Sequence, residues 1–142
     1  MLLQDMFHNS ERVVTVAPDQ PLRHVGQLMQ DGNVGAVVVA ENNRLIGIVT
    51  DRDLALALSS GEATRDTPVK NVMQRKVHTI WADQGVFDAC QAFAGYQVRR
   101  LPVVDRRDKL VGIISADDVV AMLARELFNI SKALEPALHV KM

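Results

Sequence analysis

The sequence is poor in two residue types on which many functional sites depend. It has one cysteine, Cys90, which excludes a disulfide within the chain and any zinc cluster built on cysteine pairs. Aromatic residues make up 4%, so a platform of stacked rings for single-stranded nucleic acid is hard to build. The 4 histidines are scattered without the spacing of metal ligands, and we expect no metal site.

The chain also lacks an excess of charge and a long apolar run. Lys and Arg number 16 and Asp and Glu number 17, and this balance argues against a nucleic-acid partner. No stretch approaches the roughly 18 consecutive apolar residues of a transmembrane helix, so we expect no membrane association. The first residues do not have the pattern of a secretory signal peptide, and we expect a cytoplasmic protein.

What the sequence does contain is an internal repeat. Thr15–Gln20 (TVAPDQ) resembles Thr79–Gln84 (TIWADQ) at an offset of 64 residues. After one extra residue near Asp108 the offset becomes 65, and Leu45–Thr50 (LIGIVT) matches Leu110–Ser115 (LVGIIS). Self-similarity over this length indicates duplication of one structural unit.

Each unit is predicted to run strand, helix, strand, strand, helix. Apolar and β-branched runs predict the strands, and apolar residues at helical spacing predict the helices. The last helix is expected to begin near Ala116, to run past Leu127 and to end before Pro136. Because a unit of about 60 residues buries little surface alone, we expect the two units to pack together as a pseudo-two-fold pair. The predicted fold class is α+β.

The repeat also predicts how the chain is divided. A short helical turn is expected to lead into each unit, at 3–7 and at 69–73. Unit one with its lead-in is 1–59, a polar linker is 60–68, unit two is 69–125, and a C-terminal helical extension and tail is 126–142.

The same motif stands between the last strand and the last helix of each unit. It is Gly, two apolar residues, Thr or Ser, two further residues and Asp, at 47–53 and at 112–118. One interpretation is a nucleotide site. A helix N-terminus attracts phosphate, the carboxylate can accept hydrogen bonds from a ribose diol, and glycine lets a ligand approach the backbone. The other is a helix capping box, which Ser or Thr followed three residues later by an acidic residue forms without any ligand.

The two units resemble a tandem pair of CBS domains. The resemblance rests on both junction motifs in register, on Arg99–Asp105 (RRLPVVD) and on Ile48–Leu54 (IVTDRDL), and it spans residues 3 to 125. It implies a stand-alone Bateman module, which is a regulatory homodimer with ligand clefts between its two units. The implied ligand contains adenosine (AMP, ADP, ATP, NAD or S-adenosylmethionine), and no other cofactor is implied.

The resemblance also implies roles for individual residues. Asp53 and Asp118 would hold ribose hydroxyls, and Thr50 and Ser115 would contact ribose or phosphate. The first-strand residues that would meet the base are Thr15, Val16, Thr79 and Ile80. The second-strand residues that would flank the purine are Val37, Val38, Val39, Leu101, Pro102 and Val103.

Arginines for the phosphates are placed differently in the two units. Arg52 in unit one corresponds to Asp117 in unit two, whereas Arg99 and Arg100 in unit two correspond to Gly35 and Ala36. A guanidinium beside a phosphate can form two parallel hydrogen bonds, although the same arginines could equally be solvated or ion-paired surface groups. We therefore expect the two clefts to differ.

Two functions remain open on this basis. The first is a ligand-sensing module that acts in trans or through its oligomeric state. The second is a ligand-free structural or adaptor dimer that binds a protein partner. An enzyme is not expected, because the sequence has no Ser-His-Asp arrangement, reactive-cysteine context, metal cluster or P-loop.

Overall fold

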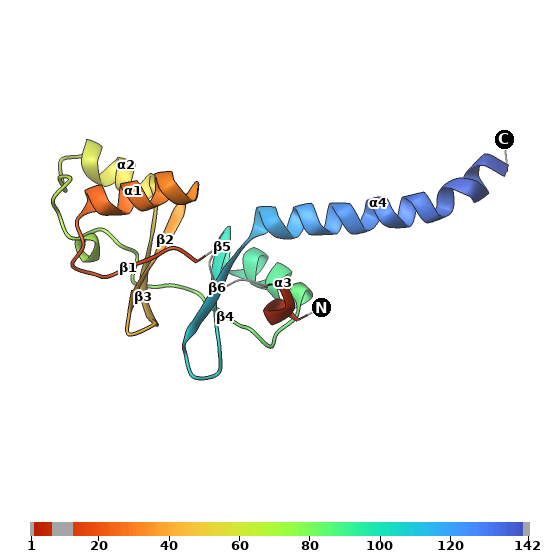
Figure 1. Ribbon diagram of the computed structural model, residues 1–142, viewed down its shortest axis with the longest axis horizontal. Helices are drawn as coiled ribbons and strands as arrows, with labels where there is room; N and C mark the ends of the chain where they lie inside the picture. Colours follow the sequence, from red (N-terminus) through yellow and green to blue (C-terminus); the bar gives the residue numbers. More distant parts are fainter. Residues whose placement is uncertain (1, 7–12, 141–142) are drawn as a thin grey trace.

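The chain folds into two three-stranded sheets, each accompanied by two helices (Figure 1). The computed structural model describes residues 2–6 and 13–140, with side chains as far as residue 135. Each unit follows the order strand, helix, strand, strand, helix. The predicted α+β class and the two tandem units are confirmed.

Unit one contains β1 (Thr15–Val16), α1 (Leu22–Gly32), β2 (Ala36–Glu41), β3 (Arg44–Thr50) and α2 (Asp51–Ser59). The sheet order is β1-β2-β3, with β1 parallel to β2 and β2 antiparallel to β3. Helix α1 supplies the crossover that a parallel pair of strands requires.

Unit two contains β4 (Ile80–Trp81), α3 (Val86–Tyr96), β5 (Arg100–Val104), β6 (Leu110–Ser115) and α4 (Ala116–Val140). Its sheet order β4-β5-β6 and its strand directions repeat those of unit one. Both last helices begin directly after a strand, so the Thr or Ser of each motif lies at a strand-to-helix junction.

The two hairpins explain the one-residue change in the repeat offset. Asn42 and Asn43 turn the first hairpin with φ values of 52° and 63°, a conformation that asparagine tolerates. The second hairpin is one residue longer. The Asp105 carboxylate accepts hydrogen bonds from the backbone N–H groups of Arg107 and Lys109 at 2.8 and 2.9 Å, and Asp108 adopts φ 62°.

Alternate residues of the middle strands face the two sides of each sheet. Val37 and Val39 belong to the core cluster of unit one, and Leu101 and Val103 belong to that of unit two. Val38 and Pro102 are equivalent residues, are buried and belong to neither cluster. They face away from their own unit's core, and we infer that the other unit covers them.

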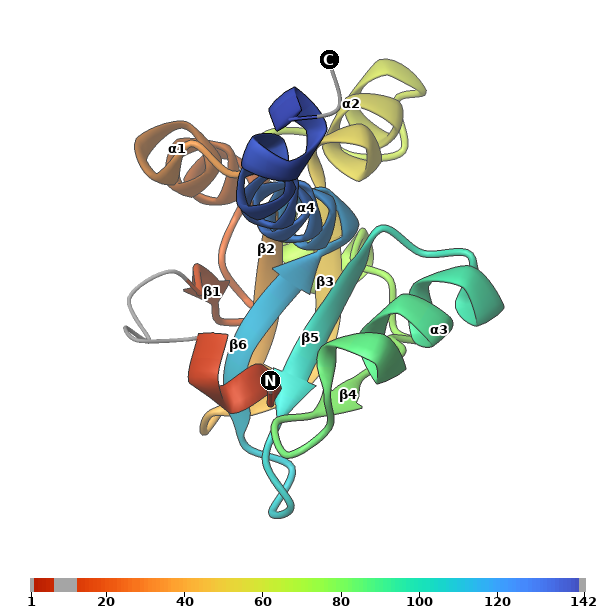
Figure 2. The same cartoon turned by 90° about the vertical axis from the view of Figure 1, so that its right-hand side faces the viewer.

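A pseudo-two-fold axis passes between the two hairpins. Arg44 and Lys109, which are equivalent at the offset of 65, form a β-bridge with each other. The Leu110 N–H donates to the Asn43 carbonyl at 3.1 Å beside them. Figure 2 shows β5 and β6 in front of β2 and β3, so the sheets pack face to face.

Each lead-in turn packs against the unit that it does not precede. The turn Leu3–Met6 hydrogen-bonds to unit two, with the Leu3 N–H donating to the Gln84 carbonyl at 2.8 Å. The turn Val69–Asn71 bonds unit one in the same way, through the Val69 N–H and the Gln20 carbonyl at 2.8 Å. The sequence predicts a turn that leads into each unit, and it does not predict which unit each turn packs against. The exchange places Leu3 and Val69, both fully buried, in the cores of the opposite units.

Helix α4 is longer than the sequence predicts. It runs from Ala116 to Val140, so its backbone continues through Pro136, and the prediction that it ends before this proline is wrong. A proline removes one amide hydrogen bond, and this close to the helix end few further bonds depend on it. Across the described residues, no helix is long and apolar enough to cross a membrane.

Candidate functional site

The two strand-to-helix junctions are built alike. The Asp51 N–H at the start of α2 donates to the Gly35 carbonyl at 3.0 Å, and the equivalent Ala116 N–H donates to the Arg99 carbonyl at 2.8 Å. These bonds hold the start of each helix against the residue that precedes the second strand of the same unit, which is β2 in unit one and β5 in unit two. We call Thr50–Asp53 junction one and Ser115–Asp118 junction two.

Junction one is a closed capping box. The Asp53 N–H donates to the Thr50 hydroxyl at 3.2 Å, and the Thr50 N–H donates to the Asp53 carboxylate at 2.9 Å. The Gln74 side-chain amide also donates to both carboxylate oxygens, at 3.0 and 3.2 Å. Capping, which the sequence left as one of two interpretations, is therefore present here, and the Asp53 carboxylate accepts three hydrogen bonds from two donor groups.

Junction two is more open. The Asp118 N–H donates to the Ser115 hydroxyl at 3.0 Å. Within the part of the chain that the structure describes, the Asp118 carboxylate makes no hydrogen bond or ion pair, and the residue is exposed. The two junctions thus differ in whether their aspartate has an acceptor site free.

Arg100 connects junction two to unit one. It pairs directly with Ser115 across the β5–β6 ladder. Its Nη2 atom lies 3.0 Å from the position that a Cβ on Gly35 would occupy, and the Asp51 carboxylate lies 3.2 Å from the same position. Gly35 therefore leaves room for a guanidinium that reaches from one unit to the other.

The other two predicted arginines lie in different surroundings. Arg99 forms an ion pair with Asp117 at 3.2 Å, and both side chains are more than three-quarters exposed. This pair offsets the positive charge that Arg99 would offer a phosphate. The guanidinium of Arg52 is exposed and has no hydrogen bond or ion pair among the described residues.

Most of the predicted base-flanking side chains are core residues. Val37, Val39, Leu101 and Val103 are 0% exposed, and Val38, Pro102, Val16 and Ile80 are also buried. In this conformation only backbone atoms of these strands could contact a ligand. Thr15, at the start of β1, and Thr79, which directly precedes β4, are exposed.

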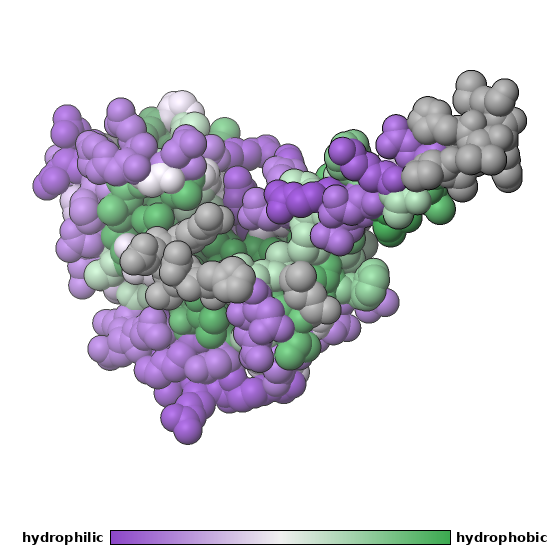
Figure 3. All heavy atoms as spheres, turned by 45° about the vertical axis from the view of Figure 1, so that its right-hand side comes forward, coloured by the Kyte–Doolittle hydropathy of each residue, from purple (hydrophilic) through white to green (hydrophobic). Residues whose placement is uncertain are grey.

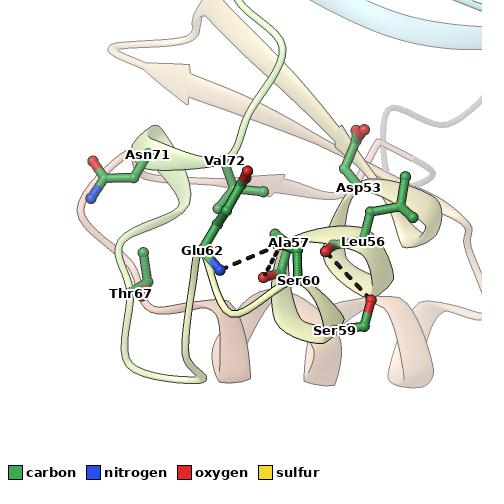
Figure 4. A pocket seen from close by; sticks show the side chains of 9 residues that line it. All are labelled: Asp53, Leu56, Ala57, Ser59, Ser60, Glu62, Thr67, Asn71 and Val72. Carbon is green, nitrogen blue, oxygen red and sulfur yellow. Dashed lines mark hydrogen bonds between the residues drawn. The ribbon is translucent and has the colours of Figure 1, made fainter.

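Two surface pockets contain predicted residues. One of about 530 Å³ lies between α2 and the linker, and Figure 4 shows Asp53 at its edge, turned away from Ser59 and Ser60. Another of about 300 Å³ lies beside α3 and is lined by Thr79 and Ile80. Neither lining includes a residue of junction two. Among the described residues no group of three His, Cys, Asp or Glu could hold a metal ion.

Two contacts around the junctions were missed by sequence reasoning. Gln74 reaches Asp53 because the chain after the second lead-in returns to β3, where it forms a β-bridge with Ile48. Gly47 makes room for this segment, since a Cβ there would lie 2.5 Å from the Met73 sulfur. The close approach expected at this glycine is made by the chain itself. No local signal in the sequence points to either contact.

The comparison with known proteins settles the family. The sequence model of the CBS domain matches residues 5–60 and residues 69–125, which are the two units described above. The chain belongs to the CBS domain family. CBS domain-containing protein YhcV of Bacillus subtilis is 39% identical over 108 residues, which cover 76% of each chain.

CBS units also occur within enzymes, but the likeness there is partial. Inosine-5′-monophosphate dehydrogenase of Thermoplasma acidophilum is 31% identical over 108 residues, which cover 76% of this chain and 21% of the enzyme. The shared part is therefore the CBS pair, and most of the enzyme has no counterpart in this chain.

Solved CBS structures have the same fold. The CBS domain protein NE2398 superposes with a TM-score of 0.74 at 31% identity, covering 86% of this chain and 93% of that one. The cytosolic domain of the Mg²⁺ channel MgtE, in complex with ATP, has a TM-score of 0.68 at 26% identity, covering 78% and 45%. PAE2072 from Pyrobaculum aerophilum, complexed with AMP, has a TM-score of 0.75 at 19% identity, covering 88% and 99%, which shows the fold alone.

Proposed function

We propose that this chain is a regulatory module that binds an adenosine-containing nucleotide at junction two. It acts in the cytoplasm as a homodimer, through its oligomeric state or a protein partner. The observation that carries the proposal is the exposed Asp118 carboxylate, which has no partner among the described residues. It stands one helical turn from Ser115, whose hydroxyl accepts from the Asp118 N–H and whose backbone is the ladder partner of Arg100.

Each group at junction two suits one part of a nucleotide. A carboxylate accepts hydrogen bonds from the two ribose hydroxyls, and a guanidinium pairs with phosphate oxygens. The N-terminus of α4 adds the positive end of a helix dipole, which favours the negative charge of a phosphate. Because Arg100 reaches Gly35, phosphate bound there would contact both CBS units.

Junction one is the weaker site in this proposal. A ribose at Asp53 would have to displace Gln74 or the N–H of Thr50, both of which already donate to the carboxylate. Giving up hydrogen bonds to a charged acceptor costs about 1.5–3 kcal/mol each. We therefore expect one tight site for each chain.

The ligand class is supported by the relatives. MgtE, at 26% identity, is seen with ATP, and PAE2072 is seen with AMP. Both ligands share adenosine, which the ribose-binding carboxylate and the backbone of the first strand would recognise.

A ligand-free adaptor is the second candidate. The observation that favours it is a row of exposed apolar side chains on α4, which includes Leu127 and Ile130. Such a surface fits a protein partner and needs no nucleotide. The two candidates differ in whether any nucleotide stabilises the fold.

Thermal unfolding tests the proposal. We expect AMP, ADP, ATP, NAD or S-adenosylmethionine to raise the midpoint, since a ligand at about 100 times its Kd adds roughly 2.7 kcal/mol to the native state. Asp118→Asn should abolish the rise, because it keeps the shape and removes the charge. Asp31→Asn, at an exposed carboxylate on α1, is the control and should leave the rise unchanged.

The result also separates the two candidates. If none of the five compounds raises the unfolding midpoint of a folded protein that carries no bound nucleotide, the nucleotide proposal is wrong and the adaptor function is supported. A shift that survives Asp118→Asn and disappears in Asp53→Asn would place the site at junction one.

A further inference from the structure

A side chain of unit two occupies the carboxylate of junction one. The Gln74 amide nitrogen lies 3.0 Å from one oxygen of Asp53 and 3.2 Å from the other, so a single NH2 group donates to both. The two hydroxyls of a ribose diol would donate to a carboxylate in the same way. Gln74 therefore satisfies Asp53 with the kind of contact that a ribose would make.

The backbone around Gln74 is held against unit one. The Gln74 N–H donates to the Ile48 carbonyl at 2.8 Å, and the Ile48 N–H donates to the Gln74 carbonyl at 3.0 Å. Met73, the preceding residue, is 8% exposed and belongs to the core cluster of unit one. Only the side chain of Gln74, and not its backbone, would have to move to free the carboxylate.

The Gln74 side chain can leave Asp53 without disturbing the core. Gln74 is exposed, so its amide can exchange the carboxylate for water. Asp53 is half-buried and keeps the hydrogen bond from the Thr50 N–H at 2.9 Å. A ligand that must first displace a hydrogen bond to a charged group loses at least about tenfold in affinity. The contact is therefore strong enough to oppose a nucleotide and weak enough to yield to a high concentration of it.

The other groups of junction one are available to a ligand. The Arg52 guanidinium is exposed, has no hydrogen bond or ion pair among the described residues, and stands in the first turn of α2, whose positive dipole end attracts phosphate. The pocket of about 530 Å³ beside α2 has Asp53 at its edge (Figure 4), and Asn71 and Val72, which lie shortly before Gln74, also line it. There is therefore space beside the carboxylate, and the Gln74 amide is the contact whose removal would open junction one.

We propose that Gln74 is an internal competitor of the nucleotide at junction one. The inference rests on the proposed function, which supplies the nucleotide. Junction two would fill first, and junction one would fill only at a concentration that displaces the amide, so one chain would respond over two concentration ranges. Because Gln74 belongs to unit two and Asp53 to unit one, filling junction one would also remove a contact between the units.

Titration calorimetry of the full chain with AMP tests the proposal in an Asp118→Asn background, which leaves junction one as the remaining site. We expect Gln74→Ala to raise the affinity for AMP in this background at least about tenfold, because no amide has to be displaced. Gln74→Met keeps the length of the side chain, removes the donor and should give a similar gain. Adding Asp53→Asn should abolish the gain.

Gln27→Ala is the matched control. Gln27 is also an exposed glutamine whose amide donates to an aspartate, Asp31, at 2.8 Å, and this pair lies within α1, outside both junctions. We expect the control to leave AMP binding unchanged. None of these variants changes the apolar side of the projecting part of α4, which Figure 3 shows, so the surface that favours an adaptor stays intact in all of them.

Two results would overturn the proposal. One is a folded Gln74→Ala protein that binds AMP no more tightly than its parent, and the other is an equal gain in Gln27→Ala. The side-chain amide signals of Gln74 in NMR spectra check the contact without any nucleotide. They should shift in Asp53→Asn, and unchanged signals would show that the contact does not form in solution. Far-UV circular dichroism checks that the variants are folded.

The same titrations separate this proposal from the proposed function. A wild-type chain that binds AMP through Asp118, while Gln74→Ala gains nothing, contradicts the internal competitor alone. A wild-type chain that binds no AMP, together with Gln74→Ala binding that requires Asp53, contradicts only the assignment of junction two. Binding in neither protein contradicts both.

Discussion

At the scale of the residue, the two junctions differ in how completely their side chains cap the helix that follows. Thr50 and Asp53 form the reciprocal capping box, whereas Ser115 accepts its cap bond and leaves the Asp118 carboxylate free of partners among the described residues. The sequence predicts both pairs at helix starts, because the Thr/Ser-x-x-Asp spacing is local. It does not predict the difference, because Gln74 reaches Asp53 from 21 residues away.

The space beside Gly47 gives the first prediction. Gly47→Ala would place a Cβ 2.5 Å from the Met73 sulfur and 3.0 Å from the Gln74 carbonyl oxygen. Overpacking of this kind lowers the free energy of unfolding by about 1–3 kcal/mol. Gly26→Ala is the matched control, since its Cβ would meet nothing within 4 Å in the middle of α1. There we expect a gain of about 0.5–1 kcal/mol. Urea unfolding measures both, and equal effects would contradict the account.

The Asp83–Arg106 pair gives a prediction about pH. Two hydrogen bonds from the Arg106 guanidinium, at 2.9 and 3.1 Å, hold the pKa of the Asp83 carboxyl below its usual range. Because this pKa is lower in the folded state than in the unfolded state, the pair stabilises the folded protein at pH values above the pKa of the unfolded state. That stability is lost as pH falls through the folded pKa.

The measurement is a carboxyl-detected NMR titration. Arg106→Gln should return the pKa of Asp83 to its usual range. The pKa of Asp105 is lowered by hydrogen bonds from the backbone N–H groups of Lys109 and Arg107, and it should stay low in the same variant. If Asp83 titrates alike in both proteins, the guanidinium is not the cause. The fluorescence of Trp81 offers a second measurement, since the Arg106 guanidinium carbon lies 3.7 Å from its ring centroid in the wild type.

At the scale of the element, the packing of each lead-in turn against the opposite unit is the main feature that short-range sequence patterns do not predict. Leu3–Met6 and Val69–Asn71 form the short turns that the sequence predicts, since each has apolar residues at turn spacing. Both units offer the same groove, because both descend from one repeat. Which groove each turn fills depends on the linker and on packing, which short-range spacing does not encode.

The exchange predicts an unusual dependence on a residue near the N-terminus. Leu3 is 0% exposed in the core of unit two, so Leu3→Ala should cost about 2–5 kcal/mol of unfolding free energy. Leu2→Ala is the control, because Leu2 is 40% exposed, and a surface substitution changes stability by about 0.5 kcal/mol or less. Thermal unfolding compares the two, and a Leu3→Ala protein as stable as Leu2→Ala would contradict the packing.

At the scale of the whole molecule, duplication makes the fold predictable from the sequence, and we propose that differences between the two copies decide the function. The repeat offset predicts the order of elements, the two junctions and the hairpins, because each follows from apolar periodicity and turn residues. The arginines follow no such rule. The sequence predicts that they differ between units, but only the structure shows Arg99 paired with Asp117 and Arg100 directed toward Gly35.

Titration calorimetry with AMP and with ATP tests the central claim most directly, because it reports affinity and the number of sites together. We predict saturable binding at one tight site for each chain of the wild type, loss of that site in Asp118→Asn, and no change in Asp31→Asn. A folded wild-type chain that releases no binding heat with either nucleotide, or one that binds equally well as Asp118→Asn, would contradict the assignment of junction two as the nucleotide site.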